Sequence, residues 1–272
     1  MFKGFYTAAS GMLTQQRKTE MLTNNMANSN TPGYKSDSSS IRTFPELLQQ
    51  SVEANSFTGN TKKTPIGSLA TGVYMQEAIP NFVQGDLQQT DMNTDLALVN
   101  NIVPGDEKNK NGSIFFTIQN ADGEVRYSRN GNFTVDGQGN LTTSNGYYVL
   151  DENNNPIQLA NDDFTVSNEG VVQGSNGEAY RLGINYTDNP QALVKEGDGL
   201  YRQQDGENLE NAYTADGVSF QLKQGFLENS NVDTSKTMTE MMAAYRSFEA
   251  NQKILQAYDK SMDKAANEIG KV

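Results

Sequence analysis

The sequence predicts an α+β protein with a long helix at each end, the two paired as a coiled coil, and a central antiparallel β domain reached through an extended linker. Three observations lead to this fold class. Residues 235–269 carry apolar side chains at alternating steps of three and four, the period of one helix face. Residues 1–28 show a similar stripe. Residues 73–225 instead contain short apolar runs separated, about every 8–12 residues, by Gly, Asn and Asp, a pattern typical of antiparallel strands.

The amino-acid composition excludes several classes of function. The 272-residue chain carries a net charge of -12, which argues against nucleic acid and anionic lipid as partners, because neither attracts an acidic protein. It contains no Cys and no His, so disulfides, thiolate chemistry and catalysis with a His base are excluded. The sequence has no run of about 18 apolar residues, and it does not begin with a basic segment followed by an apolar one. We therefore expect no membrane insertion and no cleaved Sec-type signal peptide.

Residues 235–269 predict one long amphipathic helix. No Pro interrupts the segment, and Gly270 stands where a helix C-terminus commonly places glycine. Asp233, Thr234 or Ser235 can cap the helix by accepting hydrogen bonds from its first N–H groups. The expected apolar stripe consists of Met238, Met241, Tyr245, Phe248, Leu255, Tyr258, Met262, Ala265 and Ile269.

Residues 1–28 predict a second helix, whose apolar stripe starts at the second residue. Gly4 and Gly11 each lower helix propensity by about 1 kcal/mol relative to Ala, but small residues also permit a neighbouring helix to approach closely. A helix as long as the C-terminal one needs a long partner, so we expect the two ends to pair; ordinary packing on the chain's own core is the alternative. The N-terminal stripe consists of Phe2, Phe5, Ala9, Met12, Leu13, Leu22 and Met26.

Two changes in composition divide the rest of the chain. Asn24–Lys35 contains Pro32-Gly33, which fixes a turn at the exit of the first helix. Residues 36–72, with Ser38–Ser40 and Gly59–Lys63, have the polar composition of a linker or an extended arm. The expected organisation is paired terminal helices at 1–28 and 232–272, an extended linker at 29–72 and a β-rich outer domain at 73–231.

The β domain is predicted from the turns between its short apolar runs. Ile114–Ile118 is followed by Asp122-Gly123, and another run ends at Asn130-Gly131. Asp-Gly and Asn-Gly favour hairpin turns, because their residues tolerate a positive φ. No helical segment separates the runs, so the strands are expected to be antiparallel.

Acidic side chains are the only candidates for catalysis or metal binding. A pair of carboxylates could perform glycoside hydrolysis, and Asp151-x-Asn153-x-Asn155 has the first ligands of a calcium loop, although Pro156 stands where such loops need Gly. The context of these side chains favours turns, so we expect no catalytic residue, no metal site and no cofactor. A secreted carbohydrate-acting enzyme or binding module stays as the remote alternative. The carboxylates in question are Asp136, Asp151, Asp162, Asp163 and Asp188.

Several motifs at fixed spacing carry a resemblance to a known family. One spans Phe82–Leu98, another covers Ser128–Tyr147, and a third runs from Gly225 to Asn251. The N-terminal motif within Asn24–Lys35 has Asn25, Ala27, Asn28, Thr31, Gly33 and Tyr34 at its fixed positions. Together they resemble the flagellar basal-body rod and hook (axial) proteins, most of all the distal rod proteins. Asn100–Gly112 departs from the family pattern as a longer charged insert, which we expect to form an exposed loop.

This resemblance implies a structural role in bacterial motility and no enzyme activity. The chain would polymerise through its terminal helices, which stay loosely ordered until neighbours cover them, into a helical hollow shaft linking motor to hook. Its partners would be copies of itself, other rod and hook proteins and the flagellar type III export apparatus, and its location the flagellar basal body. A hook or proximal rod protein is the alternative. The expected assembly interface is Phe2, Phe5, Ala9, Met12, Met26, Met238, Met241, Tyr245, Phe248, Leu255, Tyr258, Met262 and Ile269.

Overall fold

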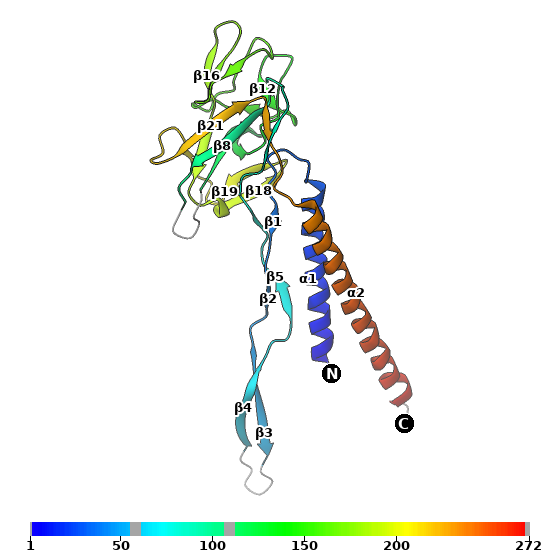
Figure 1. Cartoon of the computed structure of the whole chain (residues 1–272). Helices are drawn as coiled ribbons and strands as arrows, with labels where there is room; N and C mark the ends of the chain where they lie inside the picture. The colour runs from blue at the N-terminus through cyan, green and yellow to red at the C-terminus, as the bar shows by residue number, and fades with distance from the viewer. Residues whose placement is uncertain (1, 55–60, 106–111, 270–272) are drawn as a thin grey trace. The chain divides into compact units, whose positions relative to one another are not determined.

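The computed structural model describes residues 2–54, 61–105 and 112–269. The predicted α+β class is confirmed, with one helix near each end of the chain and a mostly antiparallel β domain (Figure 1). The chain forms two compact units. Unit 1 contains residues 1–26, 37–79 and 233–272, and unit 2 contains residues 27–36 and 80–232. Among the described residues, no helix combines the length and the apolar character needed to cross a bilayer.

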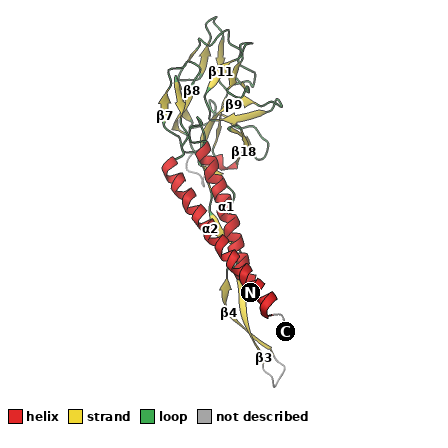
Figure 2. Cartoon of the chain, turned by 90° about the vertical axis from the view of Figure 1, so that its right-hand side faces the viewer, coloured by secondary structure: helices red, strands yellow, loops and turns green. Residues whose placement is uncertain are grey.

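Unit 1 contains both helices, α1 (Phe2–Ala27) and α2 (Thr234–Lys264), which are drawn in red in Figure 2. A π-helical segment, Ala265–Ile269, continues α2, and the expected glycine end at Gly270 lies outside the described residues. Asp233 is the N-cap among the three candidates, because its side chain accepts a hydrogen bond from Lys236 N at 2.9 Å.

The two helices run antiparallel and contact each other at small or polar residues. A Cβ atom added to Gly4 would overlap the Tyr258 hydroxyl, and one added to Gly11 would lie 2.9 Å from Asn251 Nδ2. The Thr23 hydroxyl lies 3.7 Å from Met241 Sδ. The glycines that weaken α1 therefore allow side chains of α2 to approach its backbone.

The remaining part of unit 1 consists of two-stranded antiparallel ribbons. β2 pairs with β5, β3 with β4, and β1 with β6. Hydroxyl groups of α1 hold one of these ribbons: those of Thr7 and Thr14 lie 2.8 and 3.1 Å from the carbonyl oxygens of Thr71 and Val73. Gly59 and Asn60, expected in the linker, lie outside the described residues. The strands are β1 (Asp37–Ser38), β2 (Ile41–Thr43), β3 (Leu47–Ala54), β4 (Thr61–Leu69), β5 (Val73–Met75) and β6 (Ile79–Pro80).

Unit 2 is built on a nine-stranded antiparallel sheet. Its order is β11-β12-β13-β9-β10-β19-β18, and β17 pairs with both β9 and β20. A 3-10 turn, Pro190–Ala192, precedes β18. The strands are β9 (Ser113–Gln119), β10 (Val125–Ser128), β11 (Phe133–Val135), β12 (Leu141–Thr143), β13 (Tyr148–Val149), β17 (Ile184–Thr187), β18 (Leu193–Gly197), β19 (Leu200–Gln203) and β20 (Glu210–Asn211).

Three smaller sheets complete unit 2. β14, β15 and β16 form one of them, and two ribbons, β7–β22 and β8–β21, pair strands that are distant in the sequence. Leu96, Leu98 and Leu222 of the second ribbon join the main core with Ile114 and Phe116. The expectation of an exposed loop over Asn100–Gly112 was wrong at both ends, because Asn100–Ile102 belongs to β8 and Gly112 is buried. Residues 106–111 of this insert lie outside the described residues. The strands are β7 (Leu87–Gln89), β8 (Leu96–Ile102), β14 (Thr165–Val166), β15 (Val171–Gln173), β16 (Ala179–Arg181), β21 (Ser219–Gln224) and β22 (Phe226–Glu228).

Candidate functional site: a buried ion network in unit 2

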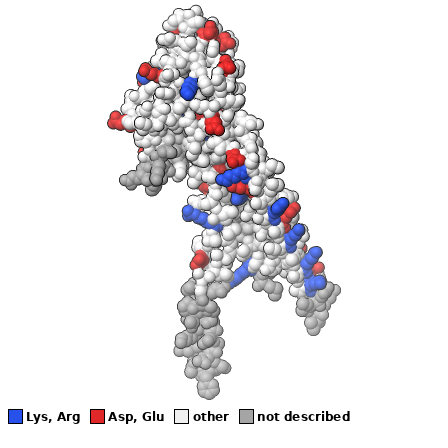
Figure 3. All heavy atoms as spheres, viewed as in Figure 1, with Lys and Arg blue, Asp and Glu red and all other residues white. Residues whose placement is uncertain are grey.

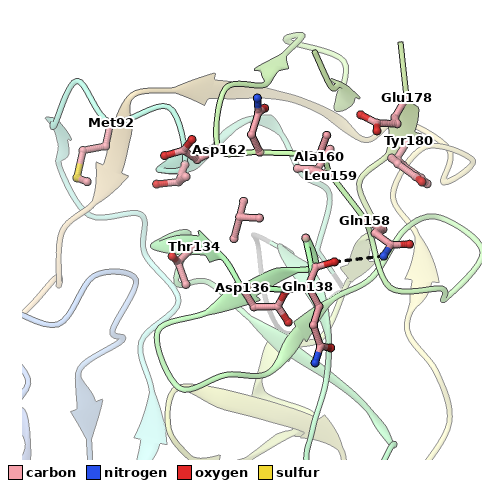
Figure 4. A pocket seen from close by; sticks show the side chains of 15 residues that line it. Met92, Thr134, Asp136, Gln138, Gln158, Leu159, Ala160, Asp162, Glu178 and Tyr180 are labelled. Atoms are coloured by element: carbon pink, nitrogen blue, oxygen red, sulfur yellow. Dashed lines mark hydrogen bonds between the residues drawn. The ribbon is translucent and has the colours of Figure 1, made fainter. Parts of the chain in front are cut away.

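The carboxylates considered for catalysis do not form a pair. An open hollow of about 720 Å³ in unit 2 is lined by Asp136, Asp162 and Glu178, and Figure 4 shows these three side chains on separate sides of it. Asp136 Oδ1 accepts hydrogen bonds from Gln138 N and Asn140 N, both at 2.8 Å. A hydrogen bond from the Asn140 side chain lowers the pKa of Asp136 further, as expected for a carboxylate that holds a turn.

Three of the other candidate carboxylates lie at turns or bends, and Asp163 lies in an irregular segment next to Asp162. Asp151 Oδ1 accepts hydrogen bonds from Asn153 N and Asn155 N, both at 2.8 Å, so this segment is a turn stabilised by its own first side chain. Asp162 and Asp188 lie in bends. Within the described part of the chain, no group of three or more His, Cys, Asp or Glu residues could hold a metal ion.

Three ionisable side chains instead meet in the interior of unit 2. Lys35, Arg129 and Glu228 are 1%, 3% and 2% exposed. The Lys35 ammonium lies 2.5 Å from Glu228 Oε1, and Arg129 Nε lies 2.7 Å from Glu228 Oε2. We call these three residues the ion network. Each comes from a different sequence motif: Lys35 from the N-terminal motif, Arg129 from the motif Ser128–Tyr147 and Glu228 from the motif Gly225–Asn251.

Arg129 also connects strands that have no backbone ladder between them. Its Nη1 donates to Ile114 O of β9 at 2.7 Å, and its Nη2 donates to Leu98 O of β8 at 3.1 Å. Glu228 Oε1 accepts a further hydrogen bond from Gly85 N at 2.9 Å. The network therefore contains two cations and one anion, held by backbone groups of Gly85, Leu98 and Ile114.

The interior position of Lys35 lowers its pKa. Burial, together with the nearby Arg129 guanidinium, lowers the pKa of Lys35 to about 8, although Glu228 opposes the shift. For Glu228, burial favours the neutral form, but the charges of Arg129 and Lys35 outweigh it and lower the pKa of the carboxyl group.

The lowered pKa of Lys35 predicts a dependence of stability on pH. Between about pH 8 and 10.5, folded Lys35 has released the proton that the unfolded chain still binds, so the stability contributed at this site rises with pH. Relative to a Lys35→Met variant, the wild-type chain should gain about 2 kcal/mol in free energy of unfolding between pH 7 and 9.5. Urea denaturation of both proteins at the two pH values measures this gain, and a pH-independent difference would contradict it.

Gly33 of the N-terminal motif lies against the network. Its φ is +69°, its N–H donates to Glu228 O at 2.7 Å, and an added Cβ would overlap the carbonyl group of Arg129. Glycine is thus required both by the backbone conformation and by the close approach of a second segment.

Replacing Gly33 with Ala tests this double requirement, with Gly146→Ala as the matched control. Gly146 also has a positive φ, +83°, but nothing lies within 4 Å of its added Cβ. We expect a loss of about 1 kcal/mol in free energy of unfolding for Gly146→Ala and about 2–3 kcal/mol for Gly33→Ala. Urea denaturation gives both values; equal losses would show that the overlap with Arg129 is relieved without cost.

Asn231 binds backbone near each point where the chain leaves unit 2. Its Oδ1 accepts a hydrogen bond from Ser36 N at 2.8 Å, and its Nδ2 donates to Asn81 O at 2.7 Å and to Val83 O at 3.0 Å. The chain enters the unit after Met26 and before residue 80, and it leaves the unit after Ser36 and after residue 232. One side-chain amide therefore binds backbone close to three of these four connections.

The fixed residues of the N-terminal motif have structural roles of the same kind. The Asn25 side chain exchanges two hydrogen bonds with the backbone of Asp37, at 2.8 and 2.9 Å. The Thr31 hydroxyl donates to Asn28 Oδ1 at 3.2 Å, and the Lys195 ammonium lies 4.2 Å from the centre of the Tyr34 ring. Ala27 ends α1 as an exposed residue.

The residues expected at an assembly interface fall into two groups. Met238 and Tyr245 are 53% and 56% exposed, whereas the side chains of Phe2 and Ile269 lie outside the description. Sequence reasoning did not select Tyr6, which is 65% exposed, and it left Leu13 (56%) and Met242 (47%) out of the expected interface. The half-buried group consists of Phe5, Ala9, Met12, Met26, Met241, Phe248, Leu255, Tyr258 and Met262.

Comparisons with known proteins match both ends and the middle of the chain. Residues 5–35 match a family described as flagella basal body rod protein, residues 111–174 match the flagellar hook protein FlgE/F/G D1 domain, and residues 223–268 match the flagellar basal body rod FlgEFG protein C-terminal family. Lys35 lies at the end of the first match, Arg129 in the second and Glu228 in the third.

Curated proteins similar to this chain are similar over their full length. The flagellar hook-basal body complex protein FlhO of Bacillus subtilis is 49% identical over 100% of both chains. The flagellar basal-body rod protein FlgG of Bacillus subtilis is 31% identical, over 98% of this chain and 99% of FlgG. FlgG of Borreliella burgdorferi is 32% identical over 98% of both. This family is structural and not enzymatic, and the chain belongs to the flagellar basal-body rod and hook proteins.

Proposed function

We propose that this protein is a distal-rod-like structural subunit of the flagellar basal body, which polymerises through its terminal helices into a helical hollow shaft linking motor to hook. The observation that carries this proposal is a row of exposed apolar side chains on α2. Met238, Met242 and Tyr245 follow one another at steps of four and three, so they lie on one face of the helix. They are 47–56% exposed, and we call them the outer ridge.

A second row on α2 has the spacing of a coiled-coil seam. Its residues recur at steps of four and three from Thr237 to Met262, and all of them are buried or half-buried. We infer that this inner seam pairs α2 with α1, whereas the outer ridge contacts neighbouring copies. The inner seam consists of Thr237, Met241, Ala244, Phe248, Asn251, Leu255, Tyr258 and Met262.

The distribution of charge supports assembly through unit 1. Unit 1 contains 12 Lys and Arg and 11 Asp and Glu residues, a net charge of +1, whereas unit 2 contains 9 and 22, a net charge of -13. Figure 3 shows acidic side chains on unit 2 and mostly basic ones along α2. Nearly neutral units can pack against one another in many copies without strong repulsion, and strongly acidic ones cannot.

The names of the relatives support the position in the flagellum only in part. FlgG is described as a basal-body rod protein and FlhO as a hook-basal body complex protein, so a hook or proximal rod protein is the second candidate. In either case the proposed partners are copies of this chain, other rod and hook proteins and the flagellar export apparatus. In a helical shaft, such contacts are heterologous and do not close.

Deletion of this protein from its native bacterium tests the proposal. We expect basal bodies purified from the deletion strain to carry a truncated rod in electron micrographs, and the wild-type protein supplied in trans should restore full-length rods. Complete rods that lack only the hook would favour the hook alternative. Intact rods and hooks in motile cells would overturn both.

A further inference from the structure

Unit 2 contains one part that is continuous in sequence and one part that is not. All nine strands of the main sheet lie between Ser113 and Asn211. The second part combines residues 33–36, 81–102 and 219–231, which include the ribbons β7–β22 and β8–β21. We call these three segments the closing layer.

Residues 219–231 supply the hydrogen-bond partners that the rest of the closing layer needs. β7 pairs with β22 and β8 pairs with β21. Between the ribbons, Thr90 N donates to Gly225 O at 2.8 Å, and Gly225 N donates to Asp95 O at 2.9 Å. Without this segment, β7 and β8 would both lose their partner strands. Even a paired two-stranded ribbon has little stability of its own, so the two single strands would not stay ordered.

The same segment supplies the negative charge of the ion network. Lys35 of the closing layer and Arg129 beside the main sheet both pair with Glu228. Two cations that are at most 3% exposed would be costly to bury without it. Both ladders and the neutralising charge therefore come from one continuous stretch of chain, Ser219–Glu228.

We propose that Glu228 is the positioning residue that closes unit 2, and that the closing layer opens and closes as one cooperative unit, separately from the main sheet. Regions of a folded protein commonly open in such contiguous units. Because α2 begins at Thr234, residues 219–231, which complete unit 2, directly precede the C-terminal helix. A chain that lacks α2 and residues 219–231 would therefore leave the closing layer unpaired. The proposal depends on the contacts within unit 2 and not on the proposed function.

Native-state hydrogen exchange of the full-length chain tests this proposal. In low urea, the amides of Thr90, Gly225 and Asn229 in the closing layer should exchange through one shared opening. The amides of Leu150 and Gly183, which donate to Thr117 O and Leu150 O in the sheet region, should exchange only through a larger opening with a steeper dependence on urea.

Variants of the ion network extend the test. Glu228→Gln should accelerate exchange of the closing-layer amides at least tenfold. Because complete unfolding also breaks the ion network, the sheet amides should accelerate by a similar factor but keep their higher opening free energy and their steeper dependence on urea. Adding Lys35→Met should restore part of the protection. Glu152→Gln is the matched control, because Glu152 pairs with Arg181 near the surface, 3.5 Å apart, and should change none of these rates.

Two results would overturn the proposal. One is a common opening free energy and a common urea dependence for the closing-layer and sheet amides, in the wild type and in Glu228→Gln, which would mean that unit 2 unfolds as a whole. The other is unchanged protection of the closing layer in that variant. If Glu228→Gln does not fold, the wild-type exchange decides alone: a single opening free energy for all these amides would contradict a separate closing layer.

Discussion

Replacing Glu228 with Gln is expected to lower the free energy of unfolding of unit 2 by about 3–5 kcal/mol, the usual cost of removing one partner from a buried ion pair. The substitution keeps the size of the side chain but leaves Lys35 and Arg129 as buried cations without a carboxylate. Replacing Lys35 with Met should cost less than about 1 kcal/mol, although Lys35 is no more exposed than Glu228.

The expected asymmetry follows from the charges and from the hydrogen bonds that remain. Removing the Lys35 ammonium leaves Arg129 and Glu228 as a neutral pair. Glu228 Oε1 keeps the hydrogen bond from Gly85 N, and Val83 O, which accepts from Lys35 at 2.9 Å, keeps the one from Asn231 Nδ2. Lys35→Met therefore creates no unsatisfied buried acceptor.

Urea denaturation at pH 7, followed by circular dichroism in the β-sheet region, measures both losses. Glu152→Gln again serves as the control, because a partly exposed ion pair contributes at most about 1 kcal/mol. Equal losses for Glu228→Gln and Lys35→Met would show that hydrogen-bond geometry, and not the charge balance, determines the stability of the network.

Periodicity predicted the helices and the hairpins of this protein because those elements depend on local sequence. The steps of three and four located α1 and α2 to within a few residues, and Asp122-Gly123 located the turn between β9 and β10. The expectation of a hairpin turn at Asn130-Gly131 was wrong, because this pair connects β10 and β11, which do not pair with each other. The N-cap at Asp233 was one of three candidates, and only the geometry of its hydrogen bond to Lys236 N selects it.

The ribbons of unit 1 were not predicted as strands, because their sequence has the composition of a loop. Ile41–Thr43 is exposed along its whole length, so no alternation of apolar and polar residues marks it. The hydroxyl groups of Thr7 and Thr14, which lie near carbonyl oxygens of this region, gave no signal either, since Thr in a helix usually faces solvent or its own backbone.

The ion network was missed for a different reason. Lys35, Arg129 and Glu228 each lie inside a motif that was recognised, but a charged residue in a polar motif has the same appearance whether it is buried or solvated. Their common position depends on contacts between segments 94 and 99 residues apart along the chain, which no local pattern encodes. The glycines beside them, Gly33 and Gly85, were the available signal, because close approach of backbone requires glycine.

The outer ridge carries the second large effect that we expect. Met238→Gln, Met242→Gln and Tyr245→Gln combined should raise the protein concentration needed for polymerisation by roughly 100-fold. Each side chain is about half exposed in the single chain, so its burial against a neighbour contributes about 1 kcal/mol, and three such contributions correspond to roughly two powers of ten in affinity. The fold of the single chain should be unaffected, because the three residues lie outside the inner seam.

Sedimentation of polymers from the purified chain over a range of concentrations measures this change, and restoration of motility in the deletion strain measures it in the bacterium. The matched control combines Thr239→Gln, Ser247→Gln and Ala250→Gln, three exposed residues of α2 outside the ridge, and should polymerise as the wild type does. Phe248→Ala in the inner seam should instead reduce the helical signal of the dilute chain. If the ridge variant polymerises normally and restores motility, the subunits must associate through another surface, because the most exposed apolar row of α2 would then be dispensable.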